Sequence, residues 1–167
     1  MAGFTQTLTS LPTGLIGTVG GVQNLVEQGY LLADSTAVPV GRGVVYDSAN
    51  SSASQLCAKL PSTTGQKFLG VARINPILQE IDATLAYAQG EIITTVTNAP
   101  LGVWVETTDA VDPSDPVYLQ HTLNSGRAPG TFRTDSDSSN ADLLDPAVVR
   151  WGGVFTSGKA LLLINQP

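Results

Sequence analysis

Apolar and polar residues alternate in short runs along most of this chain of 167 residues, and turn-forming residues separate the runs. The run Leu101–Thr107 shows the pattern clearly, because Leu101, Val103 and Val105 fall on one face of an extended chain. A period of two residues is typical of a β-strand with one buried face. The pattern therefore predicts strands as the main elements of the fold.

Three such runs follow one another between Tyr87 and Thr122. The first, Glu91–Asn98, is rich in Ile, Val and Thr, which favour strands, and Ala99-Pro100 separates it from the second run. The third, Pro116–Thr122, follows a turn in which two Asp-Pro pairs exclude a helix. We interpret this part of the chain as a β-meander of three strands.

Further runs on both sides of this meander predict more strands. We expect a hairpin over residues 41–60 and a strand over residues 67–75. Residues 147–165 predict a terminal hairpin, and the continuous apolar run Leu161–Ile164 suggests that its last strand is buried on both faces. The fold class that follows is all-β: an antiparallel β-sandwich or barrel with an extended N-terminal arm and little helix.

Three segments depart from the strand pattern. Residues 76–87 begin with Pro76 and place apolar side chains near helical spacing, so a short helix and a packed loop both fit. Residues 24–30 could form one or two helical turns. Residues 122–146 are turn-rich, with one short apolar run around Phe132, and predict a surface loop.

The N-terminal part has a different composition, and we divide the chain into an arm, residues 1–40, and a β-rich domain, residues 41–167. Residues 14–22 are apolar and rich in glycine, which loses much conformational freedom when it becomes ordered. We therefore expect the arm to become ordered against another surface. The alternative is a first hairpin of the core, with residues 22–32 packed under the sheet. The side chains expected to make the contact are Phe4, Leu11, Leu15, Ile16, Val19 and Val22.

The charge of the chain narrows the set of partners. Charged residues make up 13% of the chain, about half the usual share, so we expect much of the surface to meet protein in a homo-oligomer. The formal net charge of −6 and the scattered Lys and Arg residues argue against a nucleic-acid partner. We see neither a signal peptide nor an apolar run of membrane-spanning length, and we expect no membrane partner.

No motif indicates catalysis, a cofactor or a metal site. The single histidine, His121, has no local nucleophile or orienting carboxylate, and the single cysteine, Cys57, is expected in the core. Residues 135–142 bring four oxygen-bearing side chains together but lack the glycine and glutamate of an EF-hand, so we interpret them as a solvated acidic loop. These four side chains are Asp135, Asp137, Asn140 and Asp142.

Seven segments together carry a resemblance to a known family: PVGRGVVYD, KFLGVARINP, YAQGEIITTVTNAPLGVWVE, VDPSDPVYLQHT, SGRAPGTFRT, AVVRWGGVF and GKALLLIN. In this order they resemble the structural cement, or capsid decoration, proteins of tailed bacteriophages. That family commonly has Gly-Asp-Pro-Val-Tyr where this chain has Ser114 followed by Asp-Pro-Val-Tyr. Residues 1–38 carry little of the resemblance.

The resemblance implies a β-rich protein on the outside of a capsid, commonly a trimer, that strengthens contacts between capsomers. It implies the major capsid protein as partner and the virion as location, with the host cytoplasm during assembly. A carbohydrate-binding or other adhesive β-module on the virion surface is the alternative, and it would need exposed aromatic rings. An enzyme is the least supported class. The rings available are Trp104, Trp151, Tyr46 and Tyr118.

Overall fold

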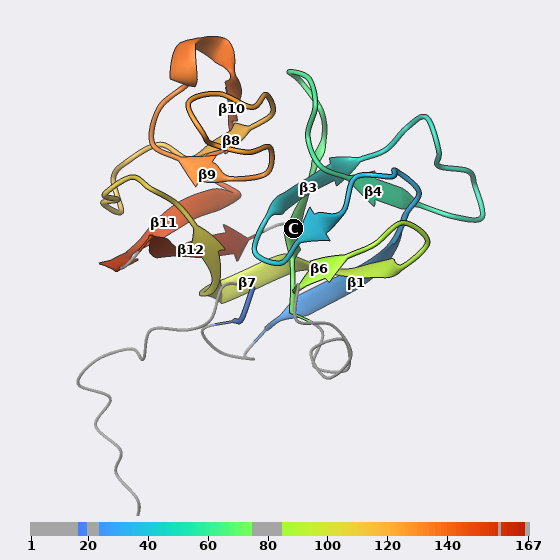
Figure 1. Cartoon of the computed structure of the whole chain (residues 1–167). Coiled ribbons are helices and arrows are strands. Elements are labelled where there is room, and N and C mark those ends of the chain that lie inside the picture. Colours follow the sequence, from blue (N-terminus) through green and yellow to red (C-terminus); the bar gives the residue numbers. More distant parts are fainter. Residues whose placement is uncertain (1–16, 20–23, 75–84, 157, 166–167) are drawn as a thin grey trace, which may run out of the picture.

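The computed structural model describes residues 17–19, 24–74, 85–156 and 158–165. Nearly all regular structure in these residues is β-strand, and the helical element among them is the short 3-10 helix η1, Asp137–Ser139 (Figure 1). The described part holds no helix that is both long enough and apolar enough to cross a membrane. The all-β prediction is confirmed.

Five strands close into a ring. In order around the ring they are β1 (Val26–Leu32), β4 (Cys57–Lys59), β3 (Gly43–Tyr46), β5 (Phe68–Ala72) and β7 (Ile92–Glu106), and β7 pairs back with β1. The β1–β4 pair is parallel, whereas the other four pairs are antiparallel. A ring with an odd number of strands cannot alternate direction at every step, and the β1–β4 pair is where the antiparallel arrangement is interrupted. Closure removes the free edges that would otherwise attract other strands.

The long strand β7 joins this ring to the rest of the molecule. Its first half pairs with β1 and β5, and its second half pairs with β12 (Lys159–Asn165), which pairs in turn with β11 (Val149–Thr156). Both predicted hairpins, β3–β4 and β11–β12, are confirmed, as is the strand β5.

A bulge explains why β7 is one strand where two were predicted. Leu162 and Ile164 of β12 pair with Val103 and Ala99 of β7, so one residue of β12 faces three residues of β7. Proline is tolerated at a bulge because no ladder hydrogen bond needs its missing N–H. Pro100 lies in this bulge, and so the pair Ala99-Pro100 bends the strand without ending it.

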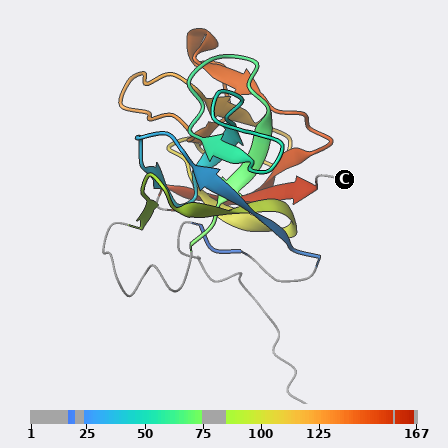
Figure 2. The same ribbon diagram turned by 90° about the vertical axis from the view of Figure 1, so that its right-hand side faces the viewer.

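Two small sheets complete the fold. One contains β8 (Tyr118–Gln120) between β9 (Phe132–Arg133) and β10 (Ala141–Leu143), and it lies at one end of the molecule in both views (Figures 1 and 2). The other pairs β2 (Val38–Pro39) with β6 (Ala86–Tyr87). The predicted meander is wrong, because its first two runs form the single strand β7 and its third, β8, pairs with β9 and β10 and not with β7.

Two segments with helical spacing contain strands. Residues 24–30, which could have formed one or two helical turns, lie largely in strand β1, whose backbone pairs with β7 from Val26 to Leu31. Within residues 76–87, Ala86–Tyr87 is a strand, and residues 76–84 lie outside the described residues. In both places pairing with a distant strand overrides the local pattern.

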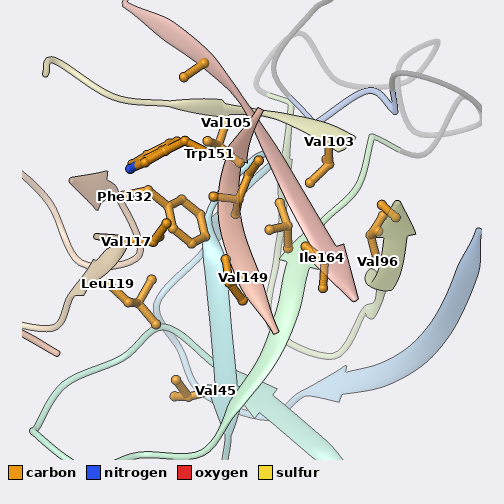
Figure 3. Close-up of a cluster of buried hydrophobic side chains, with 14 residues drawn as sticks. Val45, Val96, Val103, Val105, Val117, Leu119, Phe132, Val149, Trp151 and Ile164 are labelled. Carbon is orange, nitrogen blue, oxygen red and sulfur yellow. The ribbon is translucent and has the colours of Figure 1, made fainter. Parts of the chain in front are cut away.

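The buried side chains form two clusters, and neighbouring residues of one strand contribute to different clusters. Val44 belongs to the first cluster, whose side chains come from all five ring strands and from β2 and β6. Val45, the next residue of β3, belongs to the second cluster. This second cluster fills the space between the ring, the β11–β12 hairpin and the small sheet of β8 and β9, with Phe132 beside Val117 and Trp151 (Figure 3). The strands are therefore buried on both faces.

Residues 17–19 form a short strap across the fold. The N–H of Gly17 donates to the carbonyl oxygen of Trp104 at 2.7 Å. The N–H of Ile74 donates to the carbonyl oxygen of Gly17 at 3.1 Å. The N–H of Trp104 donates in turn to the carbonyl oxygen of Thr18. Val19 forms a bridge with Val103 and packs against the second cluster. The strap fixes the point from which residues 1–16 depart.

Candidate interaction surface

A groove of about 550 Å³ lies where the ring meets the small sheet of β8, β9 and β10. Three separate segments line it: residues 34–42, which contain β2, residues 60–62 after β4, and residues 121–129 between β8 and β9. Its volume is in the range of protein ligand sites. The lining residues include Pro39, Arg42, Leu60, Pro61, His121, Leu123 and Pro129.

The walls of the groove are mainly apolar. Three prolines, Pro39, Pro61 and Pro129, line it and offer no backbone N–H to a ligand. Leu123 lines it as well and is 67% exposed, more than any other large apolar side chain that the structure describes. Exposed apolar side chains that lie together are typical of a surface that a protein partner covers.

The charged groups at the groove are already engaged within the chain. The Arg42 guanidinium pairs with the Glu106 carboxylate at 2.7 Å and also donates to the carbonyl oxygen of Ala128. Burial lowers the pKa of Arg42, and the charge of Glu106 opposes that effect. Asp34 accepts a hydrogen bond from the N–H of Thr36. The Nε atom of Arg42 and the Nε2 atom of His121 are nevertheless buried without a hydrogen-bond partner in the described part of the chain, so the lining holds polar atoms beside its apolar walls.

His121 lines the groove and is nearly buried. Its side chain is 8% exposed, its Nδ1 lies 2.9 Å from the hydroxyl of Thr122, and its Nε2 lies 3.9 Å from the Asp142 carboxylate. Its backbone N–H donates to the carbonyl oxygen of Asn140. These contacts hold the end of β8 against the segment before β10.

Cys57 is buried and free, as predicted, and its thiol donates to the carbonyl oxygen of Asn50. The two indole rings offered by the adhesive hypothesis are also buried, because Trp104 and Trp151 belong to the core. Tyr46 and Tyr118 are half-buried. An exposed Trp platform for a sugar ring is thus absent from the described residues.

The acidic segment 135–142 is less solvated than the sequence predicted. The Asp137 carboxylate accepts hydrogen bonds from Gln120 at 2.8 Å and Asn124 at 2.9 Å, and it pairs with Arg133 at 2.7 Å. The hydrogen bond from Gln120 is the main cause that lowers the pKa of Asp137, against a smaller opposing effect of burial. Asp135 also pairs with Arg133 but remains exposed. This network holds the loop after β8 in place.

The same segment is joined to the ring. Asp142 accepts hydrogen bonds from the hydroxyl of Thr64 at 2.6 Å and from the N–H of Gly65 at 2.7 Å. No cluster of three or more His, Cys, Asp or Glu side chains suited to a metal occurs in the residues that the structure describes. The carboxylates of this segment therefore position the walls of the groove.

Of the six predicted contact residues, Val19 is the one within the described ranges, where it is half-buried against the chain's own core. The other five lie outside them: Phe4, Leu11, Leu15, Ile16 and Val22. The groove itself was not predicted. Its walls come from three segments that are distant in sequence, so no local pattern could have indicated it.

Nearly the whole chain matches a known protein family. The sequence model of the family described as "Structural cement protein (E217 gp24/Pam3 gp6)" matches residues 4–164. The chain belongs to this phage cement family. The match includes most of residues 1–38, which carried little of the resemblance in the sequence.

The fold also has a relative among solved structures. A chain from "The capsid of Myoviridae Phage XM1" superimposes with a TM-score of 0.67 at 17% sequence identity, over 97% of this chain and 98% of that chain. A comparison with curated proteins finds none that matches. Family membership assigns this cement protein a structural, capsid-associated role, which confirms that much of the function implied by the resemblance.

Proposed function

We propose that this cement protein binds the outer surface of an assembled phage capsid as a homotrimer and strengthens the contacts between neighbouring capsomers. The observation that carries this proposal is the match of the cement family over residues 4–164. The major capsid protein is the partner, and binding takes place in the host cytoplasm during assembly. The protein acts through binding alone, without catalysis.

Exposed aliphatic side chains support a role in protein contact. Val26, Ile92 and Leu101 project from the paired strands β1 and β7, each at least 45% exposed. Leu56, Leu85, Leu123 and Leu143 are exposed as well. Together with the low share of charged residues, these side chains suit a surface that meets other protein chains.

The N-terminal segment supports a second kind of contact. Phe4, Leu11, Leu15 and Ile16 precede the strap, which anchors their segment to β7 through backbone hydrogen bonds. We propose that these side chains, with Val22, contact the capsid or a neighbouring subunit. Such a contact spreads over many small groups, and its strength on a shell comes from the number of copies.

Co-sedimentation tests the function. Purified protein is mixed with capsids that lack it, and we expect saturable binding together with a higher temperature of capsid disruption, because a ligand that binds only the intact shell stabilises it. A folded double variant with His121→Ala and Cys57→Ala should bind capsids like the wild type, because the proposed function needs no catalysis. Failure of the wild type to bind, or loss of capsid stabilisation in the folded double variant while it still binds, would contradict the proposal. Glycan binding without capsid binding would favour the adhesive alternative.

A further inference from the structure

The groove beside Leu123 carries a negative charge that the chain does not balance. The charges of Arg42 and Glu106 cancel, because these two side chains pair at 2.7 Å. Asp34 also lines the groove, and its carboxylate accepts a hydrogen bond from the N–H of Thr36. Asp34 forms no ion pair in the described part of the chain. A hydrogen bond from a neutral N–H leaves the charge in place, so this carboxylate is available to a cationic group of a partner.

Two buried nitrogen atoms of the lining residues lack a hydrogen-bond partner in the described part of the chain. They are the Nε of Arg42 and the Nε2 of His121, whose side chain is 8% exposed. The Nε of an arginine is always a donor, and the Nε2 of His121 is a donor when its Nδ1 accepts from the hydroxyl of Thr122. Buried donors are rarely left unpaired in proteins, so a wholly apolar ligand does not suit this groove. A peptide offers suitable acceptors in its backbone carbonyl oxygens.

The rest of the lining is mainly apolar. Pro39, Pro61 and Pro129 contribute to it, and Leu123 is 67% exposed. Lysine and arginine suit both parts of the groove, because their methylene stems cover apolar surface while the charged end reaches a carboxylate. The volume of about 550 Å³ accommodates a few side chains. The chemistry that matches the groove is therefore a peptide segment with a lysine or arginine beside aliphatic residues.

Charge also separates the candidate partners. A second copy of this chain would bring a further net charge of −6 to a groove that is already negative. A nucleic acid or an acidic peptide would also bring like charge. A sugar would find no exposed indole ring in the described residues, since Trp104 and Trp151 are buried. The partner favoured by these features is a different protein, and the proposed function supplies one in the major capsid protein.

From these observations we infer that the groove binds a segment of the major capsid protein that carries a lysine or arginine beside aliphatic residues. The inference rests on the proposed function and names the site through which that function acts. The cationic group pairs with Asp34, and the aliphatic side chains pack against Leu123 and the prolines. The two contacts together select the segment by charge and by apolar surface.

The affinity of the full-length protein for capsids that lack it tests the charged contact. Asp34→Lys should weaken binding at least tenfold at low salt, because it places a like charge against the cationic group. The matched control is Asp145→Lys. Asp145 accepts a hydrogen bond from the N–H two residues further on, as Asp34 does, but it does not line the groove. We expect the control to bind within about twofold of the wild type.

A photochemical cross-link identifies the occupant. Leu123→Cys is labelled with a benzophenone maleimide, which the buried Cys57 should not take up, and is irradiated on capsids. Mass spectrometry should find the label attached to a capsid-protein peptide that has a lysine or arginine next to the linked site. The control is Leu143→Cys with the same label, since Leu143 is 57% exposed but does not line the groove. We expect at least a tenfold lower linked fraction in this control.

Several outcomes would overturn the inference. One is a link from position 123 to another copy of this chain, or to a capsid peptide without a basic residue. Another is equal binding of the folded Asp34→Lys and Asp145→Lys variants. If thermal unfolding shows that Asp34→Lys does not fold, the cross-link decides, and the absence of a link rejects the inference. Wild-type co-sedimentation is measured in parallel: if the wild type binds capsids while these tests fail, this inference alone falls, and if the wild type does not bind, the proposed function falls.

Discussion

At the scale of single residues, Gly70 sets the closest approach between two strands of the ring. A Cβ at this position would lie 2.1 Å from the carbonyl oxygen of Val96 on β7, and the φ angle of Gly70 is +150°. The residue also lies where the register between β3 and β5 shifts. Glycine is the residue that fits both the backbone conformation and the space.

We expect Gly70→Ala to destabilise the fold far more than a comparable glycine substitution. Gly65→Ala is the matched control, because Gly65 has a φ angle of +75° and open space around its Cβ position. The control should lose about 1–2 kcal/mol for its backbone conformation alone. Gly70→Ala should lose more than about 3 kcal/mol, since a backbone clash between paired strands adds to the strain. Urea unfolding measures both, and equal losses would contradict the steric argument.

At the scale of elements, the sequence predicted those strands whose partners are near in the chain. The hairpins β3–β4 and β11–β12 have turn-forming residues directly between two apolar runs, so local signals were sufficient. The continuity of β7 through Pro100 was not predictable in this way. It depends on β12, more than fifty residues away, which pairs on both sides of the bulge.

The same limit applies to β1 and to the groove. Val26–Leu32 has weak local preference and becomes a strand because β7 and β4 pair with it. The role of Asp137 likewise depends on Arg133, Gln120 and Asn124, whose meeting requires the folded loop. The acidic composition could be seen in the sequence, whereas the hydrogen bonds that hold the groove wall could not.

The strap gives a prediction at this scale. Deletion of residues 2–16 should leave a folded protein, because the hydrogen bonds of Gly17 and Thr18 remain. Deletion of residues 2–21 removes three backbone hydrogen bonds and the packing of Val19, which we expect to cost about 2–4 kcal/mol. Thermal unfolding of both variants beside the wild type provides the measurement. A large loss already in the shorter deletion would mean that residues 2–16 belong to the core.

At the scale of the whole molecule, the closed ring and the covered core explain how a chain with few charges remains folded. Ring closure gives each of the five ring strands a neighbour on both sides, whereas β11 lies at the edge of the sheet, and the two buried clusters face opposite sides of the ring strands. The apolar side chains left at the surface are available for contact with other chains.

The last prediction concerns the assembled state. We expect the full-length protein to form a trimer whose mass is three times the 17.3 kDa of the chain, because the exposed aliphatic residues and the uncharged N-terminal segment together favour contact between copies. Native mass spectrometry and light scattering over a range of concentrations provide the measurement. A monomer in solution would be consistent with assembly on the shell alone, so protein released gently from capsids is measured as well. A protein that is monomeric both at high concentration and on release would contradict the trimer, and capsid stabilisation would then arise from single chains bound side by side.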